Sequence, residues 1–81
     1  MAFIEKELLM SRVQYLEEVN SRPGKVPVDK SVSKKVKEMI QSGELISFMQ
    51  VEAVFNFLAE KTAENPAQID AYATEILAFI S

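Results

Sequence analysis

The chain has 81 residues, 48% of them hydrophobic and 26% charged, a composition that suits one small folded domain and excludes both disorder and a fibrous repeat. Histidine and cysteine are absent, which removes the commonest general base, the thiol nucleophile and the soft metal ligands. With a net charge of −3, the sequence predicts a single domain over residues 1–81 that is not an enzyme and holds no cofactor or metal.

The first expected element is a helix over residues 3–20, because neither glycine nor proline interrupts this segment. Apolar residues at helical spacing form its expected core stripe: Ile4, Leu8, Leu9, Tyr15, Leu16 and Val19. Met10 and Val13 fall outside this stripe. The first helix therefore carries apolar residues on more than one side.

A connection over residues 21–28 follows, where two prolines and a glycine disfavour helix. Asp29 is a good N-cap for a second helix over residues 30–42, because its carboxylate can accept from the free amides of the first turn. Gly43 suits the position just after that helix, where the chain usually turns with a positive φ. We therefore expect the second helix to be capped at both ends.

A third helix is expected over residues 48–63, because Ser47 and Gln50 have the spacing of a capping box. A fourth is expected over residues 66–80, with Asn65 as its N-cap and Pro66 at the first helical position. No stretch shows sustained alternation of apolar and polar residues, so strands are not expected. The sequence thus predicts an all-α fold, a compact four-helix domain with short connections.

Apolar residues beyond the core stripes are candidates for a partner-binding surface. Met49, Ala53 and Phe57 form a second ribbon along the third helix, and Met10 and Val13 add apolar area on the first. Such a ribbon either meets a partner or is buried because its helix is central and packs on two sides. Periodicity alone leaves both interpretations open.

Basic residues are concentrated between positions 22 and 37, where the net charge is +5, whereas residues 38–81 carry −6. The basic stripe consists of Arg22, Lys25, Lys30, Lys34 and Lys37. It could steer an acidic partner or simply keep the surface solvated. Nucleic-acid binding is less favoured, because the stripe holds no aromatic residue for base stacking and the third helix would present carboxylates to phosphates.

Several short segments on either side of the proline-containing connection form a further pattern within residues 3–46. They are Met10-Ser11, Tyr15-Leu16-Glu17-Glu18, Lys37-Glu38-Met39-Ile40-Gln41-Ser42 and Glu44-Leu45-Ile46. In these segments the chain resembles the late-transcription coactivators of T-even-type bacteriophages, small proteins that bind host RNA polymerase and the phage sliding clamp. The resemblance implies a phage-encoded protein that binds RNA polymerase as an activator or an inhibitor.

Together these patterns predict a non-enzymatic protein-binding regulator, with RNA polymerase as the partner that the resemblance implies. The alternatives are a self-associating structural or assembly protein and nucleic-acid binding through the lysine-rich second helix. Charges near the N-terminus interrupt any signal-peptide pattern, and no apolar run approaches the roughly 18 to 20 residues of a membrane span. We therefore expect a cytoplasmic protein, in the host cytoplasm if it is phage-encoded.

Overall fold

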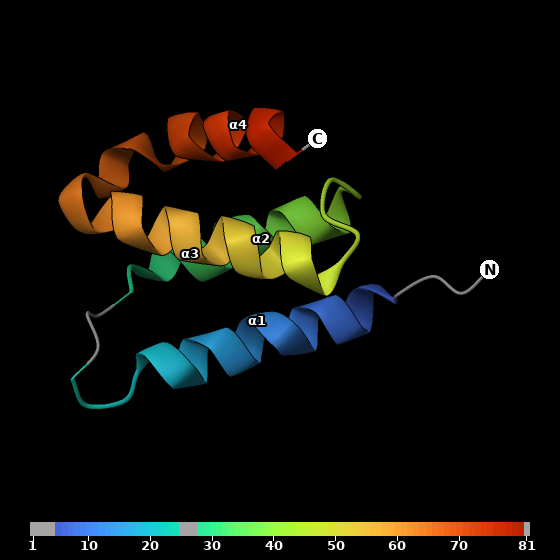
Figure 1. Cartoon of the computed structure of the whole chain (residues 1–81), viewed down its shortest axis with the longest axis horizontal. Coiled ribbons are helices and arrows are strands. Elements are labelled where there is room, and N and C mark those ends of the chain that lie inside the picture. The colour runs from blue at the N-terminus through green and yellow to red at the C-terminus, as the bar shows by residue number, and fades with distance from the viewer. Residues whose placement is uncertain (1–4, 25–27, 81) are drawn as a thin grey trace.

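Helices that run in alternating directions make up the fold in the computed structural model, which describes residues 5–24 and 28–80 (Figure 1). The elements are α1 (Lys6–Asn20), α2 (Lys30–Gln41), α3 (Phe48–Glu64), a 3-10 turn (Pro66–Gln68) and α4 (Ile69–Ile80). No strand occurs in these residues. The predicted all-α four-helix domain is therefore confirmed, with helix bounds close to those expected from the sequence.

Side-chain caps explain where α2 and α3 begin. The Asp29 carboxylate accepts hydrogen bonds from the Ser31 amide at 2.9 Å and the Ser31 hydroxyl at 2.6 Å. The Ser47 hydroxyl accepts from the Gln50 amide at 3.2 Å. The Gln50 side chain reaches back to the Ile46 amide at 2.8 Å, one residue earlier than the usual capping box places it. Both predicted caps are therefore present.

The other predicted ends differ from one another. After α2, Gly43 has a φ of +84°, and the Glu44 amide donates to the Met39 carbonyl oxygen, so the helix ends in a Schellman motif. Before α4, Asn65 makes no side-chain capping bond, and Pro66 opens a 3-10 turn that becomes α-helical only at Ile69. The predicted start of the fourth element at residue 66 is therefore correct, but the asparagine cap is wrong.

The helix α3 lies at the centre of the domain. It packs against α1, α2 and α4, and Figure 1 shows it between α1 and α4 with α2 behind. Its inward side is fully buried at Val51, Val54, Phe55 and Leu58. Because α3 uses this side to meet three neighbours, its opposite side is left for solvent or for a partner.

On α1 the expected core stripe is partly wrong. The buried row is Leu9, Val13 and Leu16, whereas Leu8 is 53% exposed and Tyr15 is 51% exposed. Spacings of four and three residues bring Leu9, Val13 and Leu16 to one side of the helix, and this side meets α2 and α3. Leu8 and Tyr15 lie beside this row at its solvent edge. Ile4 lies outside the described residues.

Candidate interaction surface

The outer side of α3 carries the ribbon that the sequence predicts. Met49 is 82% exposed, Ala53 is exposed, and Phe57 is half-buried because α4 partly covers it. These residues are spaced by four, so they lie along one side of the helix, opposite the buried row. Of the two interpretations of the ribbon, the structure supports an open surface at Met49 and Ala53 and partial packing at Phe57.

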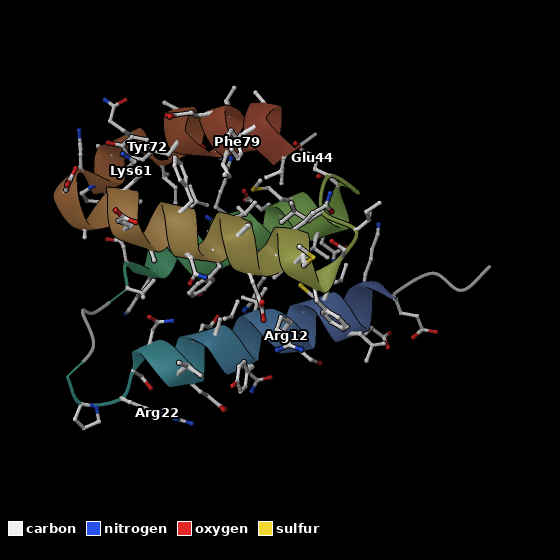
Figure 2. All side chains as sticks on the ribbon, in the orientation of Figure 1. Arg12, Arg22, Glu44, Lys61, Tyr72 and Phe79 are labelled. Atoms are coloured by element: carbon white, nitrogen blue, oxygen red, sulfur yellow. The ribbon has the colours of Figure 1, made fainter. Side chains whose placement is uncertain are left out.

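Between α3 and α4 lies a shallow apolar pocket of about 370 Å³, lined by Phe57, Glu75, Ile76 and Phe79. The Phe79 ring at its edge is 86% exposed and can be followed on α4 in Figure 2. On the other side of Phe57, the Lys61 ammonium lies 5.7 Å from the ring centroid, within reach of a cation–π contact. The pocket is large enough to take a large apolar side chain.

On the opposite flank, α1 contributes an arginine that sequence reasoning missed. The Arg12 guanidinium lies 4.9 Å from the Phe48 ring centroid and 5.4 Å from that of Tyr15, and it pairs with the Glu52 carboxylate at 3.2 Å. These contacts connect α1 to the start of α3. Leu8, Arg12 and Tyr15 are spaced by four and three residues, so they lie on one side of α1. This spacing was the sequence signal that could have identified Arg12 as part of a surface.

We call the exposed and half-exposed apolar residues on and beside α3 the α3 face: Leu8, Tyr15, Met49, Ala53, Phe57 and Phe79. Two residues assigned to the partner surface from sequence do not belong to it. Val13 is fully buried in the core, and Met10, although half-buried like Phe57, lies on the other side of the buried row of α1 from Leu8 and Tyr15. The inference was wrong for Val13 because the row it belongs to is the one that faces α2 and α3.

The basic stripe is divided among different environments. Lys37 pairs with Glu17 on α1, with Nζ and Oε1 3.6 Å apart, while Arg22, Lys30 and Lys34 are exposed and form no ion pair within the residues that the structure describes. Lys25 lies outside those residues. The lysines of α2 therefore do not form one free, continuous patch.

A further lysine of α2 helps to hold α4 in place. The Lys35 ammonium lies 2.7 Å from the Asp70 carboxylate and 3.9 Å from that of Glu38. The hydrogen bond that Lys35 donates to Asp70 raises the pKa of Lys35 above its ordinary value, although partial burial opposes the shift. Lys35 and Lys37 thus connect α2 to α4 and to α1 respectively.

A hollow of about 460 Å³ lies where the end of α1 meets the start of α2. Most of its lining residues are polar, but the surface that they present to it is mainly apolar: Glu17, Asn20, Ser21, Val28, Asp29, Lys30 and Ser33. The enclosed Glu17 oxygen already faces the Lys37 ammonium, and the Asp29 carboxylate is used as the cap of α2, which lowers its pKa. The two carboxylates of this hollow, Glu17 and Asp29, therefore serve the fold.

Within residues 5–24 and 28–80, no group of three or more acidic, histidine or cysteine side chains is placed to hold a metal ion. In the same part of the chain, no helix has the length and apolar character needed to cross a membrane. Comparison with protein-family models, with curated proteins and with solved structures finds no significant match. The function is therefore argued from the α3 face itself.

Proposed function

We propose that the protein is a non-enzymatic regulator that binds another protein through the α3 face. The observation that carries this proposal is the grouping of large apolar side chains on both flanks of one helix, with Met49 at 82% exposure and Phe79 at 86%. Contiguous exposed apolar groups on a small domain are typical of partner surfaces. Arginine, tyrosine and methionine are residue types that interfaces favour: Arg12 lies over the Tyr15 ring, and Met49 directly follows Phe48, which Arg12 also contacts.

The partner that we propose is bacterial RNA polymerase, with the protein acting as a phage-encoded activator or inhibitor of transcription. The support for this choice is the resemblance of residues 3–46 to the late-transcription coactivators of T-even-type phages. Much of that region forms α1 and α2, and α1 contributes Leu8 and Tyr15 to the α3 face, with Arg12 between them. The resembling segments and the candidate surface therefore share one helix.

Binding of the purified chain to immobilised bacterial RNA polymerase, measured by biolayer interferometry, tests the proposal. We expect Phe57→Ala to weaken binding by about 1 to 3 kcal/mol, the usual range for an apolar anchor, while circular dichroism stays unchanged. The matched control is Gln14→Ala, an exposed residue on α1 that lies away from the side carrying Leu8 and Tyr15. Equal binding by both variants, or no binding by the unmodified chain, would contradict the proposal.

Self-association is the second candidate, because the same exposed apolar groups could be covered by another copy of the chain. Size-exclusion chromatography with light scattering distinguishes the two. A monomer favours a different protein as partner. A stable oligomer that Phe79→Arg dissociates favours the structural or assembly role.

A further inference from the structure

We propose that the pocket between α3 and α4 binds a basic amphipathic helix of the partner, with an apolar side chain of that helix seated on Phe57 and lysines or arginines beside it. This inference deepens the proposed function and rests on it. It adds the chemistry of the docking segment, which the exposed apolar groups alone do not specify. Two features of the pocket support it, the apolar groups that line it and the charges around it.

The apolar part comes from the spacing of the exposed groups. The pocket of about 370 Å³ has Phe57 and Ile76 as walls and the exposed Phe79 ring at its edge. Met49 lies eight residues before Phe57 on the same side of α3, a distance of about 12 Å along the helix axis. Apolar anchors spaced by seven or eight residues on a partner helix span a similar distance, as in helix-in-groove recognition.

The electrostatic part comes from the carboxylates beside the pocket. Glu75 lines it, and Glu60 and Glu64 follow Phe57 by three and seven residues along the same side of α3. All three are exposed, and none forms an ion pair with another residue in the described part of the chain. Lys61, whose ammonium lies near the Phe57 ring, is the one cation among them.

Three carboxylates against one ammonium make the surroundings of the pocket acidic. A basic helix would meet complementary charge there, whereas a second copy of α3 or α4 would bring the same carboxylates together. Like charges across an interface lower affinity and suppress wrong partners. The charge pattern therefore favours a basic partner over a symmetric dimer through this pocket.

A yeast-displayed library of helical peptides tests the proposal without knowledge of the natural partner. Each peptide has apolar residues fixed at positions i, i+3, i+4 and i+7, and either lysine or glutamate at every outward position. We expect selection with the labelled full chain to enrich lysine over glutamate at least several-fold at positions flanking the anchors. The enriched peptides should lose binding at least tenfold with Phe79→Ala and several-fold with Glu60→Gln combined with Glu75→Gln.

Matched controls separate the site from the rest of the molecule. Lys34→Gln changes an exposed charge on the outer side of α2 and should leave peptide binding unchanged. Circular dichroism of each variant confirms that it is folded. If Phe79→Ala does not fold, the Glu60→Gln and Glu75→Gln combination and mapping of the bound peptide by NMR chemical shifts on α3 and α4 locate the site without it.

The outcomes distinguish this inference from the proposed function. Enrichment of glutamate, or no charge preference among peptides that still need Phe79, overturns the basic helix but leaves protein binding by the α3 face intact. Peptides that bind elsewhere, or no enrichment at all, overturn the pocket as a helix site. If RNA polymerase binding also fails, the proposed function fails with it.

Discussion

The outer sides of α2 and α3 are both exposed, yet they differ in what their side chains do. On α2, Lys35 and Lys37 form ion pairs with neighbouring helices at 2.7 and 3.6 Å. On α3, Met49 and Phe57 present apolar area that no other helix fully covers. The charged helix therefore uses two of its lysines to hold its neighbours, whereas the central helix keeps an apolar surface available for binding.

The largest predicted change in stability distinguishes the buried side of α3 from its exposed side. Leu58 is fully buried on the inner side, so Leu58→Ala should lower the free energy of unfolding by about 2 to 5 kcal/mol through lost burial and a cavity. Met49→Ala on the outer side should change it by about 0.5 kcal/mol or less, as exposed substitutions usually do. Urea unfolding followed by circular dichroism measures both. Similar losses of unfolding free energy in the two variants would show that Met49 is part of the core.

A smaller change in stability is expected from the ion pairs of α2. Lys35→Gln should lower the free energy of unfolding by up to about 1 kcal/mol, because the pair with Asp70 is partly exposed and screened. Lys34→Gln, an exposed neighbour without an ion pair in the described residues, is the control and should have no measurable effect. Because folding raises the pKa of Lys35, the contribution of Lys35 to stability is complete below the ordinary pKa of 10.5 and is lost as pH rises through the folded pKa. A contribution to stability that persists above the folded pKa would contradict the role of the ion pair.

The basic stripe should affect how fast a partner binds more than how long it stays bound. Replacing Lys30, Lys34 and Lys37 with glutamine should slow association with RNA polymerase a few-fold and flatten its salt dependence, because these lysines lie on α2, away from the pocket that takes the basic helix, and would steer acidic parts of the partner during encounter. Biolayer interferometry at two salt concentrations measures both rates. Complete loss of binding would instead indicate that α2 is the interface, as nucleic-acid recognition requires.

The smallest effect concerns the cap of α2. Hydrogen bonds from Ser31 lower the pKa of Asp29, so its contribution to stability is present above the ordinary value of 3.8 and is lost as pH falls through the folded value. Asp29→Asn keeps an N-cap acceptor but removes the titration. As the pH falls from about 5 to about 2, the range in which such carboxylates titrate, we therefore expect this variant to lose less stability than the original chain. Identical pH profiles in thermal unfolding would contradict this role.

Much of the fold could be predicted because its local signals agree. Asp29, Ser47 and Gly43 each occupy the helix end that their chemistry favours, and the apolar periodicity of α2 and α3 matches the buried rows. The periodicity of α1 was ambiguous, since Leu8 and Tyr15 form a row as regular as Leu9 and Val13. Only the packing of α1 against both α2 and α3 decides which row is buried.

The candidate site was only partly predictable for a similar reason. Met49 and Ala53 could be found from helical spacing within α3. The pocket beside Phe57 depends on α4, and the stacking of Arg12 on Phe48 joins residues 36 positions apart in the chain. A single sequence carries no signal for how two helices meet, so these features needed the structure.

Site-specific photo-crosslinking tests the central claim, that the outer side of α3 is the binding surface, most directly. Benzoylphenylalanine replaces Met49 in one variant and Lys34 in a matched variant on the outer side of α2, and each is irradiated with RNA polymerase. We predict a crosslinked adduct from position 49 and none from position 34, with excess unmodified chain abolishing the adduct. An adduct from position 34 alone, or none from either position, would contradict the claim.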